Sequence, residues 1–131
     1  MEYRVCRNNP APYNDLSGKI SLLGLGTMRL PLRDAADQTS IDEEKAQEIF
    51  DYAYAHGVNY FDTAYPYHGG MSEKFCGKAL AKYPRASYHL ASKLPGWLLK
   101  CDEDVPRIFN EQLANCRTDY FDFYLAHSVH E

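Results

Sequence analysis

Three short apolar segments of this chain each end on an ionisable residue that could take part in acid–base chemistry. The end residues are Asp62, Lys93 and His127, which lie 31 and 34 residues apart. That spacing is about the length of one strand and one covering helix, so parallel strands would bring the three side chains to one rim of a sheet. A single charged residue after a buried strand is often only its solvated end. Three such residues in register favour an active site.

Strand and helix patterns alternate between these positions. Residues 22–26 are apolar and bounded by glycine, which is typical of a fully buried parallel strand. The first helix is expected to start at a capping box made by Ser40 and Glu43 and to end at a left-handed Gly57. The helical spacing of its apolar residues predicts an inward stripe made of Ala46, Ile49, Phe50 and Ala53.

Two further helices complete the pattern. The spacing predicts that one begins at Ser72, with Glu73 in its first turn, and buries Phe75, Ala79 and Leu80. The other begins at Asp102 or Asp104 with Pro106 in its first turn, and its expected inward residues are Val105, Ile108, Phe109, Leu113 and Cys116. The order β-α-β-α-β-α-β predicts a parallel sheet, either doubly wound or closed as a barrel. Residues 2–6 and 19–21 are expected to form a short β-hairpin at one end.

Composition limits the classes of protein to consider. The 131 residues are 45% hydrophobic and 14% aromatic, which favours one folded domain over disorder. With a net charge of -4 and no basic run, we expect no nucleic-acid partner and no membrane partner. No segment has the length of a membrane span and no leader pattern opens the chain, so a cytoplasmic location is expected. Cys76 and Cys116 should be small buried hydrophobes, and no spacing suggests a metal site.

The glycines of the first strand raise the question of a nucleotide fold. Gly24-Leu25-Gly26 matches part of the fingerprint of a Rossmann dinucleotide site. No third glycine follows, and the next helix begins about fourteen residues later, so a pyrophosphate cannot be placed on that helix by the usual argument. A Rossmann site is therefore disfavoured.

The most specific stretch is the loop between Asp62 and the second helix, DTAYPYHGGMSE at residues 62–73. Together with GVNYFDTA at 57–64, LGLGTMRLP at 23–31, ASK at 91–93 and RTDYFDFYLAH at 117–127, it resembles the aldo-keto reductases. The resemblance extends over nearly the whole chain from residue 19 onward. Its motifs are specific, because all four catalytic positions fall at the spacing of the family.

The resemblance implies the N-terminal half of a (β/α)8 TIM barrel, with about four βα units, and residues 1–131 as a single partial domain. It also implies reduction of an aldehyde or ketone to an alcohol, with NADPH or NADH as cofactor. The residues that match the catalytic positions, called the tetrad below, are Asp62, Tyr67, Lys93 and His127. The residues that match the positions near the nicotinamide are Gly26, Thr27, Met28 and Asp62.

These roles are chemically reasonable. Carbonyl reduction builds negative charge on oxygen, which needs a proton donor and a polarising hydrogen bond within about 3 Å of that oxygen. Tyr67 is expected to donate the proton, because the ammonium of Lys93 would stabilise the phenolate left behind. Asp62 would hold Lys93 and offset its charge. His127 would orient the carbonyl or share in donating the proton.

The length of the chain departs from the family. Eight βα units typically take about 250 residues, whereas this chain ends four residues after His127. We therefore expect a truncated reductase that is inactive alone, whose partner is the missing C-terminal half-barrel or a second copy of the chain. Two alternatives stay open. One is a non-catalytic half-barrel that acts as an interaction module, and the other is a Schiff-base lyase with Lys93 as nucleophile.

Other aromatic and imidazole side chains fit no constellation. We expect most of the remaining histidines, at positions 56, 68, 89 and 130, to be surface or helix-end residues. Trp97 follows Pro95 and Gly96 and could either line a substrate pocket or pack over the rim of the sheet.

Overall fold

The computed structural model describes residues 1–4 and 19–129. Four parallel strands form one sheet in chain order, and they are β3 (Leu25–Gly26), β4 (Tyr60–Asp62), β5 (His89–Leu94) and β6 (Phe123–Ala126). The helices that connect them are α1 (Glu43–Ala55), α2 (Met71–Leu80) and α3 (Asp104–Asn115). Single-turn helices in the connections are η1 (Tyr67–Gly70), η2 (Arg85–Ser87) and η3 (Gly96–Leu98).

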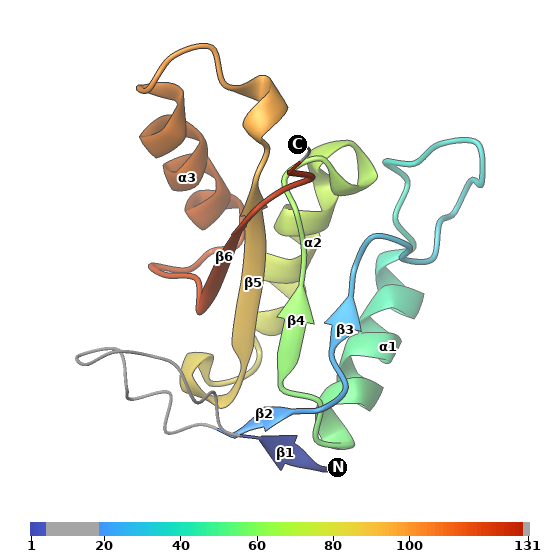
Figure 1. The fold of residues 1–131 in the computed structure, drawn as a ribbon. Helices are drawn as coiled ribbons and strands as arrows, with labels where there is room; N and C mark the ends of the chain where they lie inside the picture. Colours follow the sequence, from blue (N-terminus) through green and yellow to red (C-terminus); the bar gives the residue numbers. More distant parts are fainter. Residues whose placement is uncertain (5–18, 130–131) are drawn as a thin grey trace.

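The three helices cover one face of the sheet (Figure 1). Each strand pairs with the next one along the chain, and right-handed crossovers between such neighbours place every helix on the same side. A doubly wound sheet would carry helices on both faces. The arrangement is therefore a section of an α/β barrel, which decides between the two predicted architectures. None of the described helices is long and apolar enough to cross a membrane.

The core lies between the sheet and its helices. Phe50 of α1 and Phe61 of β4 are fully buried, and their rings stack with centroids 5.3 Å apart. Phe75 of α2 packs edge-on against Phe50 at 5.4 Å. Aromatic pairs of this kind contribute about 0.5–1.5 kcal/mol beyond the area they bury. This cluster fixes α1 and α2 against β4 and so sets where the strand ends lie.

Much of the predicted pattern is confirmed. β1 (Tyr3–Arg4) pairs antiparallel with β2 (Ile20–Ser21), as the hairpin prediction required, although residues 5 and 6 lie outside the described residues. Gly57 has a φ of 87°, in the left-handed region expected of a helix end. The predicted core residues that are buried are Ala46, Phe50, Phe75, Cys76, Ala79, Leu80, Ile108 and Cys116. Burial raises the pKa of Cys76 to about 12, so this thiol is inert, as expected of a small core residue.

The start of α1 differs from the prediction. The cap is Asp42, whose carboxylate accepts a hydrogen bond from the backbone N–H of Lys45 at 3.3 Å. The Ser40 hydroxyl instead donates to the carbonyl oxygen of Asp37 at 2.7 Å. A serine in a polar loop can close a local turn as readily as it can cap a helix, and here the turn is favoured.

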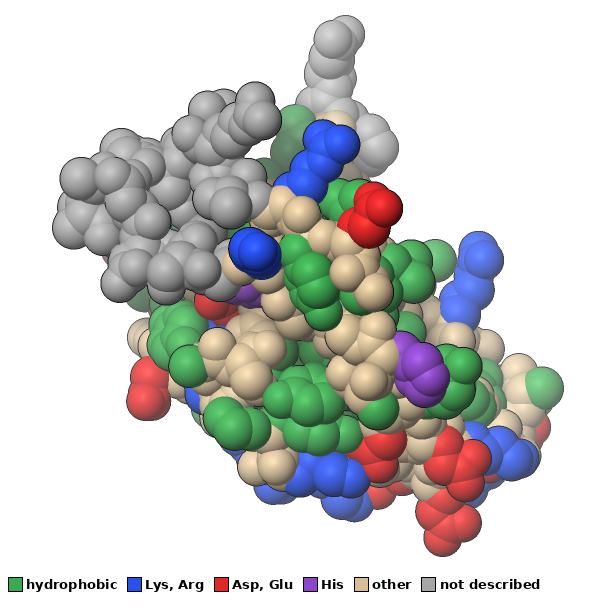
Figure 2. Space-filling model, turned by 90° about the horizontal axis from the view of Figure 1, so that it is seen from below, with side chains coloured by type: hydrophobic (Ala, Val, Ile, Leu, Met, Phe, Trp, Pro, Cys, Tyr) green, Lys and Arg blue, Asp and Glu red, His purple; other side chains and the backbone are tan. Residues whose placement is uncertain are grey.

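Several apolar side chains that were expected to be buried are exposed. Leu22 and Leu23 are 54% and 61% exposed, Ile49 is 40% exposed and Val105 is 37% exposed. The predicted five-residue buried strand is reduced to Leu25–Gly26, because among the described strands β3 has a single neighbour, β4. Seen from the end where β1 and β2 lie, apolar side chains gather in the middle of the face and charged ones line its lower margin (Figure 2).

The contact between α2 and α3 depends on a glycine. A Cβ atom on Gly77 would lie 2.6 Å from the carbonyl oxygen of Asn115 and from the carbonyl carbon of Cys116. Gly77→Ala should therefore separate the two helices and lower the free energy of unfolding by about 1–3 kcal/mol. Urea unfolding measures this loss. Gly96→Ala is the matched control, because a Cβ there meets no atom of the described residues within 4 Å. Equal stability of the two variants would contradict the packing argument.

Candidate active site

Asp62 and Lys93 form an ion pair at the carboxyl ends of neighbouring strands. The Lys93 Nζ donates to Asp62 Oδ1 at 2.6 Å and to the carbonyl oxygen of Thr63 at 2.8 Å. The Lys93 side chain is 13% exposed and the Asp62 side chain is 29% exposed. An ammonium with so little water around it needs a carboxylate nearby. The parallel pairing of β4 with β5 places the carboxylate of Asp62 next to Lys93.

Tyr67 reaches this pair from the loop that follows β4. Its ring centre lies 4.8 Å from Lys93 Nζ, within the range of a cation–π contact. The loop turns back on itself in η1, where His68 and Gly69 both have positive φ angles. This turn brings the tyrosine over the sheet and leads directly into α2.

His127 follows the last residue of β6 and completes the cluster. Its backbone N–H donates to the carbonyl oxygen of Leu94 at 3.0 Å, which fixes its position beside β5. Its ring lies edge-on to that of Tyr67, with centroids 5.8 Å apart. Burial lowers the pKa of His127, the nearby Lys93 ammonium lowers it further, and Asp62 partly opposes both effects. The imidazole is therefore neutral at pH 7, and its buried Nδ1 has no hydrogen-bond partner among the described residues.

A hollow of about 500 Å³ adjoins His127. Leu94, Trp97 and Val129 are among the residues that line it, and the Trp97 ring packs edge-on against the His127 ring at 5.0 Å. The sequence left two positions open for Trp97, and the structure shows both, since the side chain lines a hollow and packs over the rim. A largely apolar hollow with one imidazole at its edge is a suitable place for a small organic substrate.

The first-strand residues differ in what they can present to a ligand. Gly26 is exposed, and no atom of the described residues lies within 4 Å of the place where a Cβ would be. Met28 is 52% exposed. Thr27 is fully buried, and both its backbone N–H and its hydroxyl donate to the carbonyl oxygen of Asp62 at 2.9 Å. Its side chain holds the end of β4 in place and does not face solvent.

His68 was expected at the surface, and this prediction is wrong. The residue is only 6% exposed, its Nε2 accepts a hydrogen bond from Leu30 N–H at 3.1 Å, and its Nδ1 lies 2.9 Å from the carbonyl oxygen of Gln38. It ties the loop of Tyr67 to the segment between β3 and α1. A paired Gly69-Gly70 after a histidine indicates a tight turn, but the sequence does not show where that turn points.

The other histidines differ in their exposure. His89 is also buried, at 7% exposed, with its Nδ1 3.5 Å from Asp122 Oδ1, which corrects the same prediction. His56 stands at the end of α1, as predicted, with its Nδ1 2.7 Å from the carbonyl oxygen of Tyr52. His130 lies outside the described residues.

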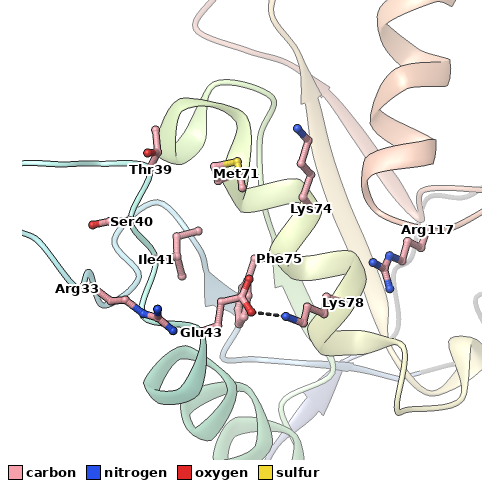
Figure 3. A pocket seen from close by; sticks show the side chains of 10 residues that line it. All are labelled: Arg33, Thr39, Ser40, Ile41, Glu43, Met71, Lys74, Phe75, Lys78 and Arg117. Atoms are coloured by element: carbon pink, nitrogen blue, oxygen red, sulfur yellow. Dashed lines mark hydrogen bonds and ion pairs between the residues drawn. The ribbon is translucent and has the colours of Figure 1, made fainter.

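A second hollow, of about 580 Å³, lies over the outer side of α2 (Figure 3). No member of the tetrad lines it. Its basic side chains are Arg33, Lys74, Lys78 and Arg117, and Lys78 points to Glu43, with which it forms an ion pair. Solvated cations around an open hollow are typical of an ordinary protein surface. The chemistry-bearing groups converge at the strand ends instead.

Comparison with known proteins identifies the family of the chain. The model of the aldo/keto reductase family matches residues 22–131. An L-galactose dehydrogenase of Arabidopsis thaliana is 32% identical over 117 residues, which cover 85% of this chain and 35% of that protein. The holo form of aldo-keto reductase AKR11C1 from Bacillus halodurans superimposes with a TM-score of 0.66 at 32% identity, covering 82% of this chain and 36% of that one.

A further solved structure, an aldo-keto reductase from Klebsiella pneumoniae in complex with NADPH, has a TM-score of 0.68 at 27% identity and covers 86% of this chain and 37% of that one. The chain thus spans about a third of the length of the relatives that it matches. The family match extends over the whole four-stranded sheet and all three helices. This chain therefore belongs to the aldo/keto reductase family of oxidoreductases, and its fold is part of an α/β barrel.

Proposed function

We propose that this chain provides the catalytic groups for reduction of aldehydes or ketones to alcohols by NADPH or NADH. The observation that carries the proposal is the contact of Lys93 with Asp62 on one side and with the Tyr67 ring on the other, beside His127. A proton donor, a cation and a neutral imidazole at one strand rim are what carbonyl reduction requires. The proposal applies to the assembly that binds the cofactor.

Each member of the tetrad has one role in this scheme. Tyr67 donates a proton to the oxygen of the substrate, and the charge of Lys93 stabilises the phenolate that remains. Asp62 holds the lysine and offsets its charge. Neutral His127 donates a hydrogen bond that orients the carbonyl group. The nicotinamide, when bound, supplies the hydride.

The residues near the proposed nicotinamide site fit a flat ring. Gly26 leaves open space at the end of β3, and Asp62 lies beside it in the register of the sheet. Met28 offers an exposed apolar side chain close by in the sequence. The solved Klebsiella pneumoniae relative holds NADPH, which supports a nicotinamide cofactor for this chain.

The Schiff-base alternative is less favoured. A nucleophilic lysine must be uncharged to attack a carbonyl group. Lys93 Nζ already donates to a carboxylate and to a backbone carbonyl oxygen. These contacts hold the Nζ beside Asp62 and Thr63 and leave it less free to attack a carbonyl carbon.

Replacing Tyr67 tests the proton donor. In any assembly of this chain that oxidises NADPH in the presence of an aldehyde, Tyr67→Phe should lower kcat by roughly 10²- to 10⁴-fold and leave cofactor affinity nearly unchanged. Steady-state kinetics and cofactor titration measure the two effects. Tyr65→Phe is the control, because that hydroxyl contacts only Glu111 among the described residues. Retention of most activity in Tyr67→Phe would exclude Tyr67 as the donor.

Replacing Lys93 tests the electrostatics of the site. Lys93→Met removes the positive charge that lowers the pKa of His127 and leaves Asp62 unpaired, so the pKa of His127 should rise. In the parent chain the lowered pKa contributes stability above about pH 6.5, and this stability is lost as the pH falls through the folded-state pKa. NMR titration of the imidazole measures the change. Lys74→Met, at an exposed lysine, should leave the titration unaltered.

A second candidate is a half-barrel that functions by association. Among the described strands, β3 and β6 each have one neighbour, and Tyr124 and Leu125 of β6 are 36% and 42% exposed. Open strand edges with apolar side chains favour pairing with another chain. We propose that residues 1–131 are a single partial domain that needs a partner, either a C-terminal half-barrel or a second copy.

The isolated 131-residue chain should therefore aggregate or pair with itself, because burial of the open edges supplies the driving force. It should not reduce aldehydes at a useful rate. Light scattering at several concentrations, together with an NADPH oxidation assay, measures both properties. A compact monomer with carbonyl-dependent turnover would show that this chain needs no partner.

A further inference from the structure

Two polar residues in the first turn of α2 are completely buried. Ser72 and Glu73 both have 0% exposure, although serine and glutamate usually face solvent. They follow the loop of Tyr67 directly in the sequence. A buried carboxylate is costly unless its oxygens are well satisfied, so its partners indicate what it does.

Ser72 connects α2 to the end of β4. Its Oγ lies 2.7 Å from the hydroxyl of Thr27 and 3.0 Å from that of Thr63. Thr27 in turn donates to the carbonyl oxygen of Asp62. Ser72 therefore contacts Thr63, which follows Asp62 in the chain, and Thr27, which is bonded to the backbone of Asp62.

Glu73 connects α2 to β5 and α3. Its Oε1 accepts hydrogen bonds from Ser92 Oγ and Gln112 Nε2, both at 2.7 Å, and its Oε2 accepts one from Asn115 Nδ2 at 3.2 Å. All three donors are neutral. Among the described residues, no Lys or Arg forms an ion pair with this carboxylate. Its hydrogen bonds must therefore offset the cost of its burial.

Gln112 extends the network to the last strand. Its Nε2 lies 3.0 Å from the carbonyl oxygen of Lys93, and its Oε1 accepts from the hydroxyl of Tyr124 in β6 at 2.6 Å. The side chain is completely buried. Gln112 therefore contacts the backbone of one tetrad residue, Lys93, and the strand that directly precedes another, His127.

We propose that Ser72 and Glu73 are positioning residues that fix the strand ends of Asp62, Lys93 and His127 relative to the loop of Tyr67. Thr63, Ser92 and Tyr124 connect this network to the strand ends of Asp62, Lys93 and His127, and α2, which carries Ser72 and Glu73, directly follows the turn of Tyr67. Apolar contacts tolerate small sliding movements, whereas hydrogen bonds of 2.6–3.0 Å do not. Shifts of about 1 Å at catalytic groups can cost 100-fold in rate. The inference rests on the proposed function for its catalytic consequence and on the contacts alone for its structural part.

The test compares two serine-to-alanine substitutions. Ser92→Ala removes one donor to Glu73. Ser87→Ala is the matched control, because it removes the partner of the Tyr54 hydroxyl, at 2.8 Å, next to the N-terminal end of β5. Both variants should lose some resistance to urea. Only Ser92→Ala should move the NMR signal and the titration of His127 toward those of an exposed imidazole, measured on the full chain in solution or in the solid state.

Tyr124→Phe is a second variant, since it keeps the ring and removes only the hydroxyl that reaches Gln112. It should change the His127 titration in the same direction. Unchanged His127 signals in both Ser92→Ala and Tyr124→Phe would overturn the proposal. Equal changes in the Ser87→Ala control would also overturn it, because they would show a general loss of stability.

Kinetics separates this inference from the proposed function. Where the assembled protein reduces a carbonyl, Ser92→Ala should lower kcat by roughly 10- to 100-fold with little change in KM. Altered His127 signals in an assembly that binds NADPH but reduces no carbonyl would support the positioning role and contradict the proposed function. Turnover that Ser92→Ala leaves unchanged would support the function and contradict the positioning role.

Discussion

The ion pair between Lys93 and Asp62 is the interaction on which the rest of the site depends. The ammonium of a lysine side chain that is only 13% exposed needs a carboxylate at hydrogen-bond distance, and the pair is possible because β4 and β5 are adjacent and parallel. The same ammonium contacts the Tyr67 ring and lowers the pKa of His127. One charge therefore acts on both of the other members of the tetrad, and the fold must keep the four elements that carry them in register.

The sequence predicts this meeting of residues well because it depends on spacing. A strand and a helix together take about the same length each time, so Asp62, Lys93 and His127 fall at the same rim whatever the details of the loops. Features that depend on three-dimensional neighbours are harder to predict. His68 is buried by a turn with positive φ, and Ser72 and Glu73 are buried by partners up to 45 residues away. No local pattern distinguishes these polar residues from solvated ones.

Apolar and polar contacts have different roles in this sheet. The Phe50, Phe61 and Phe75 cluster supplies the area that holds α1 and α2 against β4, but such packing defines positions only loosely. The hydroxyl and carboxylate network around Ser72 and Glu73 adds direction, because each bond has a narrow range of length and angle. A site that must hold a proton donor near a carbonyl group needs both, the first for stability and the second for geometry.

The errors in predicted burial around β3 have a common cause. Leu22, Leu23 and Ile49 surround the β3 edge, where an apolar hollow of about 420 Å³ lies beside α1. Periodicity assigns such residues to a core because their pattern is that of a covered surface, and at the β3 edge the described chain supplies no cover. The same chain matches about a third of its relatives' length. The misassigned residues therefore mark the surface at which the proposed partner half would add its apolar area, at the opposite end of the sheet from β6.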